Sequence, residues 1–161
     1  MTVIEGTGKG DGRRVALVVA KWNDFVTERL RIGAMAALDA AGVNPDAVTT
    51  VRVPGAFEIP IAAQHAAESG RFDAIVCIGC VIRGETPHFE YIASAVAQGI
   101  THAASATGVP MTFGVLTTNS AEEALARAGQ GPGNKGYEAA VAALEMADVI
   151  SQLSRPGVRQ A

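Results

Sequence analysis

Residues 75–82 read Ile-Val-Cys-Ile-Gly-Cys-Val-Ile and run through Arg83 into Gly-Glu-Thr-Pro-His-Phe-Glu-Tyr at residues 84–91. The apolar run predicts a strand, from about Asp73 to Ile82, that is buried on both faces. Apolar side chains at helical spacing then predict a helix from His88 to Thr107. A strand that is apolar on both faces and leads into a helix is typical of a parallel sheet covered on each side by helices.

The rest of the chain repeats this alternation of strand and helix. Further strands are expected at residues 14–20, 47–53 and 111–118, and each is followed by helical periodicity that ends with a helix at residues 137–153. The order predicts an α/β fold, a flavodoxin-like three-layer α/β/α arrangement with a central four-stranded parallel sheet. A short N-terminal strand is expected at Thr2–Ile4.

Length and composition bound the domain and its partners. The chain has 161 residues, 48% of them hydrophobic, so we expect a single domain over residues 1–161, with an N-terminal arm at 1–12 and a mobile tail at 154–161. The formal charge is −3 without a basic run, which argues against nucleic acid and anionic membranes as partners. No apolar stretch reaches the roughly 18 residues of a membrane helix. With no signal-peptide pattern, the chain is expected to be cytoplasmic and to bind a small molecule.

Cys77 and Cys80 form a CxxC motif, which invites interpretation as a redox pair or a zinc site. Both lie inside the predicted strand, where residues three apart point to opposite faces. Two cysteines without a second pair also supply too few ligands for tetrahedral zinc. The sequence therefore predicts two structural strand residues and no metal site.

Three loops follow the first three strands of the predicted sheet. In such a sheet, ligands bind beyond the carboxyl ends of the strands. Trp22-Asn23 follows the first strand, Gly55-Ala56-Phe57-Glu58 the second and Arg83 to His88 the third. We therefore expect the three loops to build one site.

The third loop has the chemistry of an anion site. Thr86 is a suitable helix N-cap and Pro87 suits the first helical position, so the amides of Gly84, Glu85 and Thr86 are free to bind an anion. His88 then lies in the first helical turn, where the helix dipole disfavours an imidazolium. The loop predicts a phosphate-sized site beside a histidine that can accept a proton.

Five motifs in one order make the sequence resemble a known family. They are WND at 22–24, VPGAFEIP at 53–60, CVIRGETPHFEY at 80–91, FGVLTTN at 113–119, and RAG with GNKG at 127–136. Together they resemble the lumazine synthase family over nearly the whole chain. The resemblance implies a transferase of riboflavin biosynthesis that joins 5-amino-6-(D-ribitylamino)uracil to 3,4-dihydroxy-2-butanone 4-phosphate. The product is 6,7-dimethyl-8-ribityllumazine, with phosphate and water released, and no metal or organic cofactor is implied.

The resemblance also assigns site residues. It implies that Trp22 stacks on the pyrimidine, that Glu58 accepts from the ribityl hydroxyls and that His88 carries protons. The expected catalytic residues are His88 and Arg127, and the expected substrate-binding residues are Trp22, Asn23, Ala56, Phe57, Glu58, Val81, Ile82, Arg83, Gly84, Glu85, Thr86, Phe113 and Lys135.

Some of these assignments depend on the family alone. Without it, Glu58 reads equally well as a helix-start residue. For the other three, the preferred interpretations are strand core for Phe113, a solvated helix charge for Arg127 and a loop charge for Lys135. His65 and His102 lie in the middle of predicted helices without a polar cluster, so we expect them to be surface or structural residues.

The resemblance implies a homo-oligomer with active sites shared between adjacent subunits, because Phe113, Arg127 and Lys135 come from the neighbouring subunit in this family. Its members form pentameric rings, and in some members twelve rings close into an icosahedral shell. The short 129–136 connection resembles that of shell-forming members, so we expect a sixty-subunit shell, with Pro132 as a departure from the pattern. Riboflavin synthase is a candidate partner of such a shell.

Two other functions compete with catalysis. One is a protein of the same fold that binds flavin or lumazine without turnover, and the other is a shell protein whose site has decayed. The complete set of expected site residues argues against decay. A GxGxxG match at Gly131, Gly133 and Gly136 does not indicate a dinucleotide site, because a helix rather than a strand precedes it.

Overall fold

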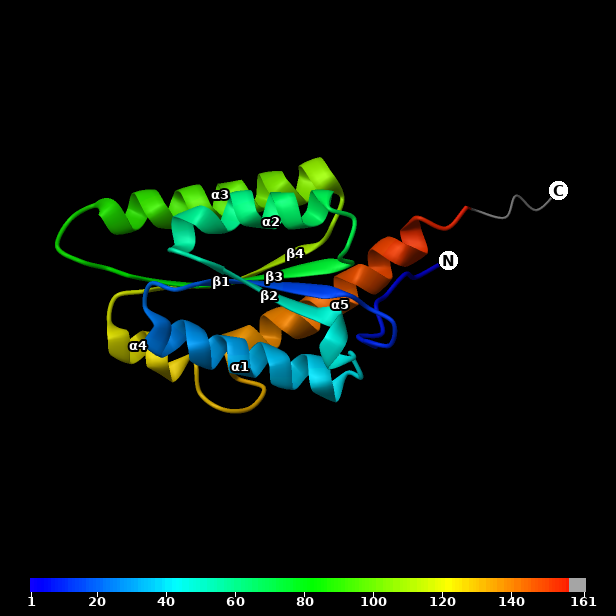
Figure 1. Cartoon of the computed structure of the whole chain (residues 1–161), viewed down its shortest axis with the longest axis horizontal. Helices are drawn as coiled ribbons and strands as arrows, with labels where there is room; N and C mark the ends of the chain where they lie inside the picture. Colours follow the sequence, from blue (N-terminus) through cyan, green and yellow to red (C-terminus); the bar gives the residue numbers. More distant parts are fainter. Residues whose placement is uncertain (157–161) are drawn as a thin grey trace.

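Four parallel strands form the centre of the computed structural model, which describes residues 1–156. They are β1 (Val15–Ala20), β2 (Val48–Val53), β3 (Ala74–Ile82) and β4 (Met111–Thr118), arranged in the order β2-β1-β3-β4. All neighbouring pairs are parallel, so the four carboxyl ends point the same way, toward the end of the molecule that carries the β3–α3 loop (Figure 1). The predicted four-stranded parallel sheet is confirmed.

Helices cover both faces of the sheet (Figure 1). One face carries α2 (Ile59–Glu68) and α3 (His88–Thr107), and the other carries α1 (Asp24–Ala40), α4 (Ala121–Ala126) and α5 (Lys135–Leu153). Two single turns of 3₁₀-helix, η1 (Pro45–Ala47) and η2 (Ala56–Glu58), flank β2. The α/β three-layer arrangement expected from the order of elements is therefore confirmed. The last helix begins two residues earlier than predicted, because the Asn134 side chain accepts from the amides of Gly136 and Tyr137.

The core forms two apolar layers, one on each face of the sheet. Every residue of β1 is buried, as the strand's uninterrupted apolar sequence requires. Cys77 packs in the layer under α2 and α3, and Cys80 in the layer under α1 and α5. Burial raises the pKa of the Cys77 thiol to about 12 and that of Cys80 to about 11. The expectation of two separate strand residues is confirmed.

Helices α1 and α5 approach each other closely through a glycine. A methyl group added at Gly136 would meet the Leu30 backbone, at 2.6 Å from its carbonyl carbon and 2.9 Å from its Cα. The buried Asn134 side chain also donates to the Arg29 carbonyl of α1 at 3.2 Å. This contact fixes the start of α5 relative to the sheet.

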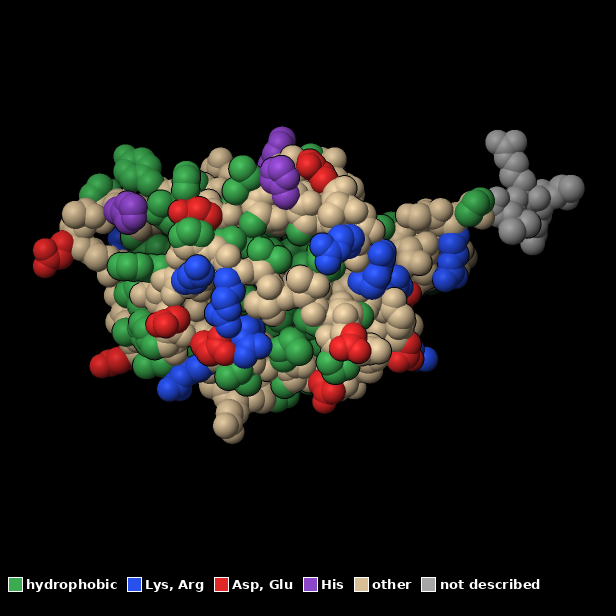
Figure 2. All heavy atoms as spheres, viewed as in Figure 1, with side chains coloured by type: hydrophobic (Ala, Val, Ile, Leu, Met, Phe, Trp, Pro, Cys, Tyr) green, Lys and Arg blue, Asp and Glu red, His purple; other side chains and the backbone are tan. Residues whose placement is uncertain are grey.

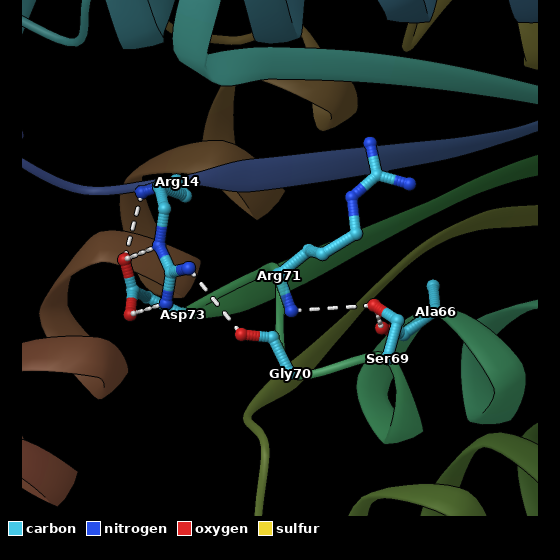
Figure 3. A network of polar contacts seen from close by, with 6 residues as sticks. All are labelled: Arg14, Ala66, Ser69, Gly70, Arg71 and Asp73. Atoms are coloured by element: carbon cyan, nitrogen blue, oxygen red, sulfur yellow. Dashed lines mark hydrogen bonds and ion pairs between the residues drawn. The ribbon is translucent and has the colours of Figure 1, made fainter.

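An ion pair ties the amino ends of the two central strands together (Figure 3). The Arg14 guanidinium lies 3.2 Å from the Asp73 carboxylate and also donates to the Gly70 carbonyl at 3.3 Å. The backbone amide of Arg14 donates to the same carboxylate at 2.8 Å, and the Asp73 amide returns a bond to the Arg14 carbonyl at 2.8 Å. This network lies at the opposite end of the strands from the three predicted site loops.

The N-terminal arm differs from the prediction. Residues 1–10 contain no strand, so the separate strand expected at Thr2–Ile4 is not formed. The arm runs along α5, where the Thr7 amide donates to Asp148 at 2.9 Å and the Gln152 side chain donates to the Glu5 carbonyl at 2.9 Å. No strand pairs with the arm within residues 1–156; besides its bonds to α5 side chains, the Gly10 amide donates to the Ala41 carbonyl at 2.9 Å. Residues 157–161 of the predicted tail lie outside the described part of the chain.

The surface carries charges of both signs. Figure 2 shows Lys and Arg side chains intermixed with Asp and Glu side chains on the face it presents, so no extended field of one sign covers that face. Among residues 1–156, no helix combines the length and apolar character needed to cross a membrane.

Candidate active site

A cleft of about 410 Å³ opens at the carboxyl ends of the strands. It joins the three loops that the sequence analysis expected to converge. Its lining includes the predicted residues Trp22, Asn23, Ala56, Phe57, Glu58, Val81, Ile82 and His88. The chain thus brings eight of the predicted residues to one place without any partner.

Trp22 is held at the mouth of this cleft by its backbone. Its amide donates to the Pro54 carbonyl at 3.0 Å, and the Lys21 amide donates to the Val53 carbonyl at 2.8 Å, so pairing between β1 and β2 continues past both strands. Trp22 is 74% exposed, which makes its indole available to a flat ligand.

Asn23 fixes the turn that follows. It is the one non-glycine residue among those described with a positive φ, 63°, a conformation that asparagine tolerates better than most residues. Its side chain does not cap α1 but donates to the Cys80 carbonyl at 2.9 Å, which links the end of β1 to β3. This bond therefore fixes the turn that carries Trp22 relative to the end of β3, which lines the cleft.

The second loop forms the single turn η2 on one side of the cleft. Ala56 is buried, the Phe57 ring is 60% exposed and Glu58 lies between these extremes. The missing side chain of Gly79 in β3 lets η2 lie close to the sheet, because a Cβ on Gly79 would be 3.0 Å from Ile59 and 3.4 Å from Ala56. The turn therefore sits directly on the sheet, with Glu58 in the cleft lining.

The third loop leads to His88, the first residue of α3 and part of the cleft lining. Gly84, Glu85 and Thr86 are exposed and lie beyond the cleft residues, and their amides donate to no acceptor within residues 1–156. The prediction of Thr86 as N-cap is wrong. Pro87 takes that position, because its carbonyl accepts the first helical bonds, from the amides of Glu90 and Tyr91.

Arg83 is not among the residues that line the cleft. Its guanidinium donates to Asn119 Oδ1 at 2.9 Å and to Glu90 Oε1 at 2.7 Å, and its Cζ lies 4.6 Å from the centre of the Phe89 ring. Its amide donates to the Thr118 carbonyl at 2.8 Å.

Three predicted residues lie in a second pocket, separate from the cleft. Phe113, Arg127 and Lys135 line a hollow of about 250 Å³ beside β4, a strand at the edge of the sheet. The Phe113 ring is 47% exposed, so the alternative of a core residue is wrong. Arg127 donates to the Glu123 carbonyl at 3.1 Å, and Lys135 pairs with Glu138 at 2.9 Å. Within one chain, these residues do not join Trp22 and His88.

The sequence analysis did not place Ile92 in the site, although it lines the cleft with His88. The two residues are four positions apart on α3 and so share one helix face, a spacing that could have identified it. Among the described residues, no three His, Cys, Asp or Glu side chains come together as a metal site would require.

Comparisons with known proteins agree with the motifs. A family model described as 6,7-dimethyl-8-ribityllumazine synthase matches residues 12–151. A curated relative from Desulfatibacillum aliphaticivorans named 6,7-dimethyl-8-ribityllumazine synthase is 45% identical over 150 residues, which cover 93% of this chain and 97% of that protein. The family resemblance drawn from the five motifs is thereby confirmed. The chain belongs to the 6,7-dimethyl-8-ribityllumazine synthase family.

Proposed function

We propose that this chain condenses its two substrates at a site shared by two subunits. The reaction is that of the family: 5-amino-6-(D-ribitylamino)uracil and 3,4-dihydroxy-2-butanone 4-phosphate give 6,7-dimethyl-8-ribityllumazine, with release of phosphate and water. The proposal of a shared site rests on one observation: the predicted residues are divided between a cleft and a separate pocket at the sheet edge.

The cleft is proposed to bind the pyrimidine substrate. Trp22 offers an exposed aromatic plane for stacking, and the ends of β3 at Val81 and Ile82 offer backbone groups to the pyrimidine edge. The loop of Ala56, Phe57 and Glu58 would hold the ribityl chain, with the Glu58 carboxylate accepting from its hydroxyls. The largely apolar lining suits a flat heterocycle.

The free amides of Gly84, Glu85 and Thr86 are proposed to bind the phosphate of the second substrate. They precede the N-terminus of α3, whose dipole favours an anion. A phosphate bound there places the ketone near His88. In the condensation, the pyrimidine amine attacks the ketone carbon, a proton moves from nitrogen to oxygen, and one water leaves as the imine forms. After phosphate departs, the ribityl-bearing nitrogen attacks the remaining carbonyl carbon, and a second water leaves as the ring closes. His88 is proposed to carry protons in these steps and when phosphate departs.

The second pocket would complete a neighbouring subunit's cleft. Phe113 would cover the other face of the pyrimidine, while Arg127, with Lys135, would pair with phosphate oxygens. Oligomeric assembly is general in the family; for this chain we propose pentamers that close into the icosahedral shell, with riboflavin synthase as a candidate partner. Light scattering after size exclusion tests the assembly, and a single peak of pentamer mass would refute the shell. The cytoplasmic location stays a prediction.

The direct test mixes the two substrates with the protein and follows lumazine absorbance. We expect a rate well above that of the enzyme-free mixture, and a rate no higher would refute the proposed function. We expect His88→Ala to lower turnover moderately while binding of the pyrimidine substrate stays near normal, because positioning alone supplies much of the acceleration. Unchanged turnover would remove His88 from the mechanism.

Complementation between two variants tests the shared site. A site needs His88 from one subunit and Arg127 from its neighbour, so co-assembly of His88→Ala with Arg127→Ala in equal amounts leaves about one quarter of the sites with both residues. The mixed assembly should be more active than the average of the two pure assemblies. The same variants assembled separately and then mixed are the control. Equal activity of mixed and control samples would show that each site draws both residues from one chain.

A further inference from the structure

The segment from Arg83 to Tyr91 extends beyond the body of the protein. Figure 1 shows the β3–α3 connection standing out from the end of the sheet. Every residue of this segment is exposed except Phe89, which is half-buried. The first turn of α3 also has no side-chain cap. Within the single chain, burial and capping therefore contribute little to holding the anion-binding amides in place.

Arg83 supplies the missing attachment. It stands at the start of the loop and reaches its far end, where the guanidinium pairs with Glu90 at 2.7 Å and lies over the Phe89 ring. The loop of residues 84–87 is thus closed by an ion pair between Arg83, which precedes the loop, and Glu90, which lies in the first turn of α3. A guanidinium suits this role because its planar donors can serve two acceptors while its face stacks on a ring.

The Arg83 side chain also connects the loop to the turn that follows β4. Arg83 Nε donates to Asn119 Oδ1 at 2.9 Å, in the turn after β4. Asn119 is itself fixed, because its backbone amide donates to Glu123 Oε2 at 3.0 Å, and the Glu123 amide in turn donates to the Ser120 hydroxyl at 3.2 Å. The guanidinium therefore connects the start of α3 to a turn that is held independently.

We propose that Arg83 is a positioning residue that holds the phosphate loop and His88 in register with the cleft through Glu90 and Asn119, and does not itself bind substrate. This inference rests on the proposed function, since it assumes that the loop binds the substrate phosphate. It replaces the expectation of Arg83 as a substrate-binding residue. It also assigns parts to Glu90 and Asn119, which the sequence analysis left out of the site.

Removal of Glu90 separates positioning from direct contact, because the two roles predict opposite results. If Arg83 positions the loop, Glu90→Gln removes the charge from its ion pair and loosens the loop, so binding of inorganic phosphate and of the phosphorylated substrate weakens by about three- to tenfold. If the guanidinium binds phosphate directly, Glu90→Gln removes a competing carboxylate, and phosphate binding stays the same or strengthens. Glu122→Gln, which removes an exposed carboxylate of α4 outside this network, controls for the change in net charge.

The experiment measures KM for each substrate and the calorimetric affinity for inorganic phosphate in Arg83→Gln, Glu90→Gln and the double variant. We expect KM for the phosphorylated substrate to rise in both single variants, KM for the pyrimidine to change less than twofold, and the double variant to be no worse than either single one. Additive losses, or unchanged phosphate affinity in Glu90→Gln, would overturn the proposal.

Amide hydrogen exchange in the protein without substrate keeps this inference separable from the proposed function. Exchange of the Glu90 and Tyr91 amides, which donate to the Pro87 carbonyl, should accelerate in Arg83→Gln and Glu90→Gln and stay at the wild-type rate in Glu122→Gln. Unchanged exchange would overturn the positioning role even in an active enzyme. A wild-type protein that makes no lumazine would refute the proposed function, while the exchange data would still decide whether Arg83 holds the loop.

Discussion

The contact between α1 and α5 predicts a large effect from a single methyl group. Alanine in place of glycine inside a helix ordinarily stabilises it by about 1 kcal/mol. At Gly136, however, the new Cβ would lie 2.6 Å from the carbonyl carbon of Leu30, and backbone cannot rotate away as a side chain can. The start of α5 must therefore move away from α1, with loss of the packing between them. We expect Gly136→Ala to lower the free energy of unfolding by about 2–3 kcal/mol despite the gain in helix propensity.

Urea unfolding followed by circular dichroism, at one fixed protein concentration, measures this effect. Gly129→Ala is the matched control, because a Cβ there meets nothing within 4 Å. We expect the control to unfold within about 0.5 kcal/mol of the wild type. A Gly136→Ala protein that is as stable as the control, or more stable, would show that α1 and α5 are not in backbone contact and would refute the reasoning.

Two further predictions concern the site and the arm. Trp22→Ala should change the free energy of unfolding by less than about 0.5 kcal/mol, because Trp22 is 74% exposed. The same variant should weaken the affinity for the pyrimidine substrate, measured by calorimetry, by about tenfold, and Trp22→Phe should retain most of that affinity. The Thr7 amide holds the pKa of Asp148 below its ordinary value of 3.8, so the contribution of this bond is complete above about pH 4 and is lost as the pH falls through the lower folded value. The protection factor of the Thr7 amide, which compares its exchange rate with that of an unstructured amide at the same pH, should therefore fall in acid, and Asp148→Asn should remove that pH dependence.

The fold was predictable because its signals are local and agree with one another. The apolar run of β3 and the helical stripe of α3 mark these elements without reference to distant residues, and α3 spans His88–Thr107 as expected. The arm shows the limit of such signals. Thr2–Ile4 has the residues of a strand, but a strand also needs a partner, and the sequence does not say whether one lies beside it.

The site was predictable to the extent that topology alone assembles it. Trp22, Glu58 and His88 converge because the carboxyl ends of parallel strands share one edge of the sheet. No periodicity points to Phe113 or Arg127, and only the family resemblance brought them into consideration. The positioning role proposed for Arg83 was not predicted from the sequence for another reason. Its acceptors, Glu90 and Asn119, come together only in three dimensions, so a basic residue beside an anion loop looked like a ligand for the anion.

The burial of Cys77 and Cys80 leaves the protein without a readily labelled thiol. The chain contains two cysteines, both buried, and their raised pKa values leave almost no thiolate at neutral pH. Maleimide reagents should therefore not react with the native protein at an appreciable rate. A single introduced cysteine, such as Glu85→Cys in the exposed β3–α3 loop, would carry the only attached label. The wild-type background thus allows a spectroscopic reporter of anion arrival without prior removal of native cysteines.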